Sequence, residues 1–424
     1  MLNNFIIKNG RVIDPVNSCD EVRDVIIENG CFVAKASSEH HFDIIDAKGA
    51  LLMPGLIDMH VHLREPGQEY KEDILSGSRA AAAGGFTGIA CMPNTDPIND
   101  CSSVTRFILE KAAGGPCKVY PVGAISKESQ GESLAEFGEM KEAGIIAVSD
   151  DGLPVADSQL MRRALEYAGG LNLPVISHSE EPTLGKGGSM NEGTVSMTMG
   201  LKGIPTATES IMVYRDIALA EYTGIPIHIA HVSTAMSAEL IRSAKKRGVS
   251  VTAETTPHYL TLTEEAVIGY NTNAKMNPPL RTELDRQAIR QAVVDGTIEV
   301  IATDHAPHSI LEKDVEFDLA ANGIIGLETS VPLILELVRE NLINYDRFVR
   351  LLSVNPARIL GVTGGSLSSG MVADLTIIDP NIRYTYEADK IVSKSRNTPF
   401  IGRELQGKAI LTMVNGHITH NILE

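Results

Sequence analysis

Apolar runs of five to nine residues alternate with Ala-rich segments of helical spacing through the middle of the chain. Runs of this kind suit strands buried on both faces of a parallel sheet, and the segments between them predict amphipathic helices. The predicted strands are 55–62, 85–93, 118–125, 144–149, 173–178, 225–232, 249–255 and 298–303. The predicted helices are 71–83, 99–113, 133–143, 157–170, 206–223, 235–247, 283–295 and 326–340.

Eight alternating strand and helix units indicate an α/β fold, a (β/α)8 barrel of the TIM type over residues 54–364. A doubly wound open sheet is the alternative. It usually has fewer strands and often a glycine-rich phosphate loop, and the chain contains neither Gly-x-Gly-x-x-Gly after a strand nor a Walker loop. The pattern therefore favours the barrel.

The two ends of the chain follow another pattern, with short apolar strands separated by tight turns. Asn9-Gly10, Asn29-Gly30 and Asn415-Gly416 are hairpin signals in these regions. Because chain termini often lie close together, we expect residues 1–53 and 365–424 to join in one small β-sandwich domain.

The bulk composition excludes some classes of partner. The formal net charge of −17 argues against nucleic acid or an anionic membrane surface as a partner. The sequence shows no leader pattern and no apolar run of about 18 residues, so we expect neither a signal peptide nor a membrane span. Five cysteines without a Cys-x-x-Cys pair favour reduced thiols in a cytoplasmic protein.

Metal-ligand side chains gather where the predicted strands end, which is the edge of a barrel that carries chemistry. They are His60 and His62, Asp150 and Asp151, His178, His231 and Asp304. Side chains two apart on a strand point the same way, so His60 and His62 lie about 7 Å apart and can bind one ion. Any one of these histidines alone would more often be structural. Together they predict a metal site.

Two ions that share a carboxylate fit this inventory better than one tetrahedral zinc, because the set is too large for a single ion. Asp150 and Asp151 compete as the shared carboxylate. Arg64 is two residues beyond His62, so on a continued strand its side chain would point to the same side as His60 and His62. Because it follows the apolar run, we expect it on the loop above the ions. A guanidinium beside a metal site suggests a carboxylate or phosphate ligand.

Motifs in order along residues 1–420 resemble those of the bacterial class I dihydroorotases, in the amidohydrolase superfamily. The motifs are His60-Val-His62-Leu-Arg64-Glu-Pro-Gly67, Met92-Pro-Asn94-Thr95, Asp150-Asp151-Gly152, Ser177-His178-Ser179-Glu180, Ala230-His231-Val232-Ser233, Glu254-Thr-Thr-Pro-His258, Asn277-Pro-Pro-Leu-Arg281, Thr303-Asp304-His305-Ala-Pro-His308 and Gly370-Met-Val-Ala-Asp374-Leu-Thr-Ile-Ile-Asp379-Pro380. No single motif is decisive, but the ordered set is specific.

The resemblance implies a zinc-dependent enzyme that reversibly cyclises N-carbamoyl-L-aspartate to (S)-dihydroorotate and water in de novo pyrimidine (UMP) biosynthesis. It implies one or two zinc ions, with two expected, and a hydroxide between them that attacks the ring amide. The implied metal ligands are His60, His62 and Asp304 for one ion, His178 and His231 for the other, and Asp151 as the bridge. Asp304 is the implied general acid and base. The implied substrate contacts are His62, Arg64, Asn94, Asn277, His308, Asn322 and Gly323. A homodimer is also implied, and an association with aspartate transcarbamoylase stays open.

Two departures refine the resemblance. Related hydantoinases use a carboxylated lysine as the bridge on strand four, but no lysine lies between Lys141 and Lys186. Ala321-Asn322 replaces a Pro-Phe pair common in the family. Without the packing of these two rings, the loop lacks the contacts that are expected to make it rigid. The rival functions are a hydantoinase or allantoinase and a catalytically silent scaffold. The missing lysine opposes a hydantoinase, and the complete ligand set opposes a silent scaffold.

Overall fold

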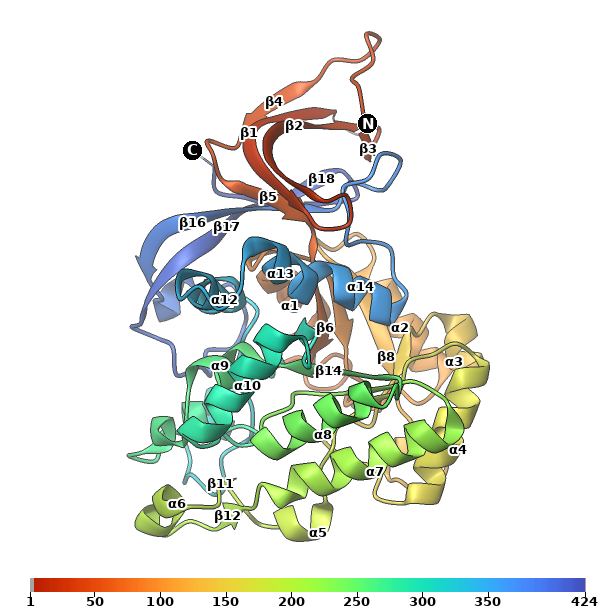
Figure 1. Cartoon of the computed structure of the whole chain (residues 1–424), viewed down its shortest axis with the longest axis vertical. Coiled ribbons are helices and arrows are strands. Elements are labelled where there is room, and N and C mark those ends of the chain that lie inside the picture. Colours follow the sequence, from red (N-terminus) through yellow and green to blue (C-terminus); the bar gives the residue numbers. More distant parts are fainter. Residues whose placement is uncertain (1–3, 424) are drawn as a thin grey trace.

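A parallel barrel lies below a mixed β-sheet in the structure, a computed structural model that describes residues 4–423 (Figure 1). Each of the eight predicted barrel strands has a counterpart. The barrel strands are β6 (Leu56–Val61), β7 (Phe86–Cys91), β8 (Lys118–Gly123), β9 (Ala147–Val148), β10 (Ile176–Ser177), β13 (Ile227–Ile229), β14 (Val251–Thr255) and β15 (Val300–Ile301).

Two parallel half-barrels join to close the ring. Within residues 4–423, β6-β7-β8-β9 form one four-stranded sheet and β10-β13-β14-β15 form the other. Parallel bridges between Val148 and Val175 and between Val61 and His305 connect them on both sides. The predicted (β/α)8 barrel is therefore confirmed, with strand eight beside strand one.

Each predicted barrel helix is also present, because its apolar stripe packs against the strands. These helices are α1 (Ile74–Ala83), α2 (Ser102–Ala112), α3 (Phe137–Ala143), α4 (Ser158–Gly170), α7 (Ala207–Thr223), α8 (Ala235–Lys246), α10 (Glu283–Asp295) and α12 (Ser330–Arg339). Side-chain caps fix several starts, such as Thr234 before α8 and Thr282 before α10.

Short elements complete the loops around the barrel. They are α5 (Pro182–Gly185), β11 (Met190–Asn191), α6 (Thr194–Met199), β12 (Gly203–Ile204), α9 (Pro257–Thr261), α11 (Ile310–Lys313), α13 (Tyr345–Val349) and α14 (Asn355–Leu360). The segment from α5 to β12 follows the carboxyl end of β10 and lies at the bottom of Figure 1, opposite the mixed sheet. The carboxyl ends of the strands therefore face away from that sheet.

Strands from both ends of the chain share the mixed sheet, in the order β18-β17-β16-β5-β1-β2-β3, with β4 beside β1. They are β1 (Phe5–Asp14), β2 (Cys19–Glu28), β3 (Cys31–Val33), β4 (Asp43–Asp46), β5 (Leu51–Pro54), β16 (Leu375–Thr385), β17 (Glu404–Val414) and β18 (His417–Asn421). This pairing supports the division into residues 1–53 with 365–424 and residues 54–364, which stays a prediction. Gly55 links β5 to β6, where a Cβ atom would lie 2.1 Å from Thr87 Oγ1.

One predicted hairpin is wrong. Asn9-Gly10 lies inside β1 as a bulge, with a register shift between Ile7 and Gly10, and the chain turns at residues 15–18 instead. Asn-Gly suits any position that needs a positive φ, and Asn9 has φ 58° within the strand. The turns at Asn29-Gly30 and Asn415-Gly416 are confirmed.

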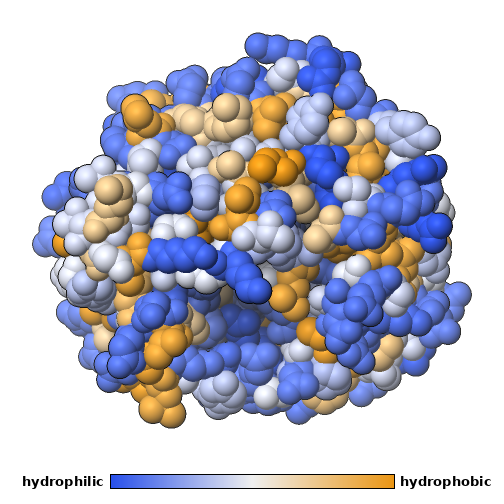
Figure 2. All heavy atoms as spheres, turned by 90° about the horizontal axis from the view of Figure 1, so that it is seen from below, coloured by the Kyte–Doolittle hydropathy of each residue, from blue (hydrophilic) through white to orange (hydrophobic). Residues whose placement is uncertain are grey.

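The face seen from below is hollowed near its middle, and the floor of the hollow is hydrophilic (Figure 2). This is the face toward which the barrel strands run. No helix within residues 4–423 is both long enough and apolar enough to cross a membrane.

Candidate metal centre and active site

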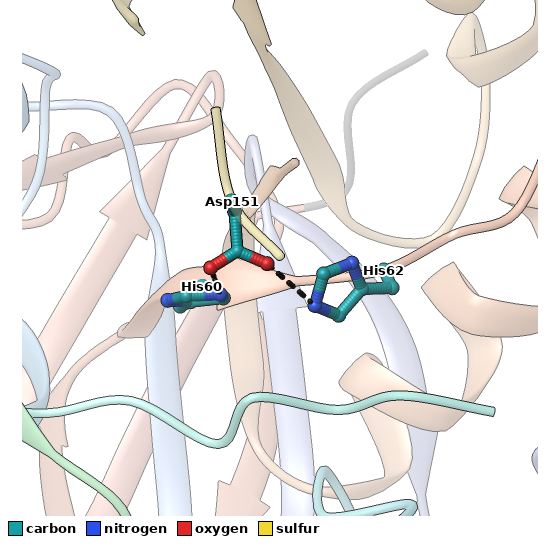
Figure 3. Close-up of side chains that lie close together, drawn as sticks. All are labelled: His60, His62 and Asp151. Atoms are coloured by element: carbon teal, nitrogen blue, oxygen red, sulfur yellow. Dashed lines mark ion pairs between the residues drawn. The ribbon is translucent and has the colours of Figure 1, made fainter. Parts of the chain in front are cut away.

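The carboxylate of Asp151 lies among the four histidines that the sequence places at strand ends. Figure 3 shows this carboxylate with one oxygen toward His60 and the other toward His62. Its Oδ1 lies 3.3 Å from His60 Nε2, and its Oδ2 lies 3.4 Å from His62 Nε2. Oδ1 also lies 3.4 Å from His178 Nδ1 and 3.3 Å from His231 Nε2. All five side chains are buried. Asp151 therefore belongs to two three-residue groups, each able to hold an ion.

The neighbouring Asp150 faces a different part of the chain. Its Oδ1 accepts a hydrogen bond from the Ile125 N–H (2.7 Å), and the backbone N–H and hydroxyl of Ser126 also donate to its carboxylate. These bonds tie the loop after β8 to the loop after β9. The structure thus brings Asp151, and not Asp150, to the histidines.

In three of the four histidines, the ring nitrogen that points away from Asp151 lies within hydrogen-bond distance of an oxygen acceptor. The contacts are His60 Nδ1 to Glu254 Oε1 (2.7 Å), His62 Nδ1 to Asn94 Oδ1 (2.8 Å) and His178 Nε2 to Glu180 Oε2 (3.0 Å). A neutral imidazole that donates from one nitrogen presents a lone pair at the other. In each of these rings that second nitrogen faces Asp151.

This arrangement fits a divalent metal. A lone pair that faces a carboxylate is unfavourable unless a positive charge lies between them, and His60 Nε2, which is fully buried, has no hydrogen-bond partner among the described residues. Imidazole nitrogens and carboxylate oxygens are common ligands of divalent ions, and their outer nitrogens are usually held as they are here. The cluster is therefore a metal-cofactor site.

Glu254 lies behind this site, at the end of β14. It is fully buried and contacts His228 Nε2 (3.2 Å) as well as His60. Glu254→Gln should weaken the binding of a divalent metal by about ten- to a hundredfold, because the His60 ring loses its fixed tautomer and orientation. Equilibrium zinc titration measures this. Glu299→Gln is the matched control, since that carboxylate pairs with Lys245 instead of a histidine. Equal affinity in the two variants would contradict a role for Glu254.

Asp304 completes the centre from the residues that follow β15. Its Oδ1 lies 3.1 Å from His62 Nε2 and 3.8 Å from His60 Nε2. Asp58 holds this end of the barrel together, because its carboxylate accepts the N–H groups of both His60 and Thr303 at 3.1 Å. Burial raises the pKa of Asp58 to about 7.

Arg64, His308 and Asn322 form a second group. Arg64 Nε donates to the Pro307 carbonyl (3.1 Å), and its Nη2 lies 3.3 Å from His308 Nε2. That same imidazole nitrogen lies 2.8 Å from the Asn322 carbonyl oxygen and donates to it. Burial lowers the pKa of Arg64 to about 10, so the buried guanidinium stays charged at neutral pH. A cation here suits an anionic ligand group.

The remaining predicted substrate contacts lie elsewhere in the site. Asn94 holds His62, and Asn277 Nδ2 donates to Glu180 Oε2 at 2.7 Å. Gly323 has φ 125° and sits where a Cβ would lie 2.5 Å from the Ala306 Cβ, so this position requires glycine. Its N–H donates to the Lys275 carbonyl (3.0 Å). The structure thus groups Arg64 with His308 and the 322–323 loop. It places Asn94 beside His62, and Asn277 beside Glu180, the carboxylate that contacts His178.

Three residues that lie around the site, Glu254, Lys313 and Asn397, are not among those predicted from the sequence. Glu254 lies at the end of a predicted strand, as the predicted metal ligands do, so its position in the sequence could have marked it as a site residue. The positions of Lys313 and Asn397 give no such indication, because both residues lie in loops that follow the last barrel strand.

Known proteins resemble this chain over nearly its whole length. The family model described as Dihydro-orotase-like matches residues 49–237. A dihydroorotase from Desulfotalea psychrophila is 59% identical over 413 residues, which is 97% of this chain and 98% of that protein. The chain belongs to the dihydroorotase family. A second member, from Pelobacter propionicus, is 56% identical over 98% of this chain and 99% of its own length.

Two solved structures with the same fold carry the names hydantoinase and dihydropyrimidinase. L-hydantoinase (dihydropyrimidinase) from Arthrobacter aurescens has a TM-score of 0.89 at 24% identity and covers 100% of this chain and 97% of its own. Dihydropyrimidinase from Brevibacillus agri has a TM-score of 0.85 at 24% identity, over 99% of this chain and 95% of its own. At 24% identity these two structures establish the fold alone.

The family predicted from the sequence motifs is confirmed by the two dihydroorotases that are 59% and 56% identical to this chain.

Proposed function

We propose that this chain is a metal-dependent dihydroorotase that interconverts N-carbamoyl-L-aspartate and dihydroorotate in pyrimidine biosynthesis. The observation that carries the proposal is the cluster around Asp151, in which every ligand predicted from the family motifs meets in one buried site. A silent scaffold has no need to keep this set.

We further propose zinc as the metal and two ions per chain. His60, His62 and Asp304 would hold one ion, His178 and His231 the other, and Asp151 would contribute to both. When bound, such a pair supplies Lewis-acid polarisation and a water whose pKa lies near neutrality.

The protein's own groups would then orient the ring and move a proton. In the hydrolytic direction the oxygen of water adds to the ring carbonyl carbon, and the bond from that carbon to the ring nitrogen breaks. Asp304 accepts a proton from the attacking water and returns it to the leaving nitrogen, so no net proton is held. Arg64 binds the substrate carboxylate, which lies away from the breaking bond and so fixes the ring's orientation. His308, Asn322 and Gly323 line the same end.

Parallel assays test the proposal against its rivals. Purified zinc-loaded protein should hydrolyse dihydroorotate and form it from N-carbamoyl-L-aspartate, with much lower rates on hydantoin, allantoin and dihydrouracil. Preferential turnover of allantoin or hydantoin would replace the proposal with the corresponding rival. A protein with little zinc and no turnover of any of the four rings would be a scaffold.

Arg64→Gln should raise the KM for dihydroorotate by about ten- to a hundredfold, since a charge-assisted hydrogen bond contributes roughly 1.5–3 kcal/mol. Any slow turnover of dihydrouracil, which lacks the carboxylate, should not change. Steady-state kinetics on both rings measure the effect, with the exposed Arg79→Gln as control. A similar loss on both rings would place Arg64 outside carboxylate binding.

The homodimer and the association with aspartate transcarbamoylase stay predictions from the resemblance, and the cytoplasmic location stays a prediction from the cysteine pattern. Size measurement in solution, with and without purified transcarbamoylase, tests the first two.

A further inference from the structure

The connection between β16 and β17 leaves the mixed sheet and reaches the rim of the barrel (Figure 1). We call residues 391–398 of this connection the strap. The backbone N–H groups of Val392 and Ser393 donate to Glu328 at 3.0 Å, and that of Lys394 donates to Glu72 at 3.2 Å. The strap is therefore held to the barrel at several points by the carboxylates of Glu328 and Glu72, of which Glu72 is fully buried.

Asn397 lies at the end of the strap and contacts two substrate-side segments at once. Its Nδ2 donates to the carbonyls of Ala306 (2.9 Å) and Gly323 (3.1 Å), and its Oδ1 accepts the N–H of His308 (3.0 Å). The side chain is 3% exposed. Each of its three bonds ends on the peptide backbone, so this one side chain fixes the loop of His308 relative to the loop of Gly323.

Lys313 holds the same loop from the other side. Its buried Nζ donates to three carbonyl oxygens, those of Ala321 (2.7 Å), Gly323 (3.1 Å) and Lys275 (3.2 Å). Within residues 4–423 no carboxylate forms an ion pair with this ammonium group. Burying an ammonium without a counter-ion costs free energy. Two of the three bonds that offset the cost, those to Ala321 and Gly323, lie on either side of Asn322.

We propose that Lys313 and Asn397 are positioning residues for the substrate-carboxylate end of the site, where they hold the 321–323 loop against His308 and Arg64. The inference rests on the proposed function. It also gives the 321–323 loop, which lacks the family's Pro-Phe pair, another source of rigidity. In addition, Lys313 adds a positive charge beside His308, which already faces Arg64 and Lys71. The mixed sheet thereby contributes to substrate binding through Asn397.

Two variants with a matched control test the inference. Lys313→Met and Asn397→Ala should each raise the KM for dihydroorotate by about ten- to a hundredfold, with kcat changed less than about threefold and zinc content unchanged. Lys390→Met is the control, because that exposed lysine pairs only with Glu387 among the described residues. An unchanged KM in both variants would overturn the inference, as would a loss of kcat and zinc at constant KM.

The pH profile of the unmodified protein gives a second test that needs no variant to fold. Burial, with the charge of Lys275, lowers the pKa of Lys313 to about 7, and loss of its proton leaves two N–H groups for three carbonyls. Two of the groups that face it titrate far from neutral pH, since the pKa values of His308 and Glu312 are lowered to about 3 and about 2. Burial also lowers the pKa of the third, Lys275, from its usual value. The KM for dihydroorotate should therefore rise as pH increases through about 7.

Lys313→Arg should hold the KM flat to higher pH, because a guanidinium keeps its charge. A wild-type KM that is constant between pH 6 and pH 9 would contradict the inference. Failure of the proposed function looks different: the unmodified protein would then not turn over dihydroorotate at any pH.

Discussion

Asp151→Asn is expected to reduce dihydroorotate turnover by more than about a thousandfold and to release zinc. Removing a single transition-state donor typically costs about 10²–10³ in kcat, and this substitution removes a charged ligand from both predicted ions. The structural basis is the set of contacts at 3.3–3.4 Å between Asp151 and the four histidines. Zinc per chain and turnover are measured on the same preparation.

Asp150→Asn is the matched control, one residue away. Asp150 binds Ile125 and Ser126 and not the histidines, so its loss should lower the free energy of unfolding by about 1.5–3 kcal/mol while folded protein keeps its zinc. Zinc loss in Asp150→Asn with zinc retained in Asp151→Asn would reverse the assignment of the two carboxylates.

Asp304→Asn should lower kcat for dihydroorotate by about 10²–10⁴, the range for removal of a general acid and base. Most zinc should remain, because the histidines and Asp151 are untouched. Rates in both directions should fall together, since one group moves the proton in each. The exposed Asp314→Asn serves as control. Turnover like that of the unmodified protein would remove Asp304 from the proton transfer.

The barrel was predictable because its signal is local and repeated. Predominantly apolar runs alternate with amphipathic segments, and burial on both faces of a parallel strand produces such runs. The Asn9-Gly10 bulge was missed because the same dipeptide suits either a turn or a bulge, and only the pairing of β1 with β2 decides between them.

The ligand histidines were predictable because the fold brings all strand ends to one edge. The choice between Asp150 and Asp151 depended on which carboxylate Ile125 and Ser126 bind, and this is a tertiary contact. Lys313 and Asn397 act on backbone carbonyls of distant loops, so neither residue type nor spacing marks them.

The most direct test of the account is the rate of dihydroorotate hydrolysis measured against the amount of zinc bound per chain. Metal-free protein should be inactive, and the rate should rise with added zinc until two ions are bound per chain. A plateau at one ion would contradict the two-ion site around Asp151. A rate that does not depend on bound zinc would contradict the account as a whole.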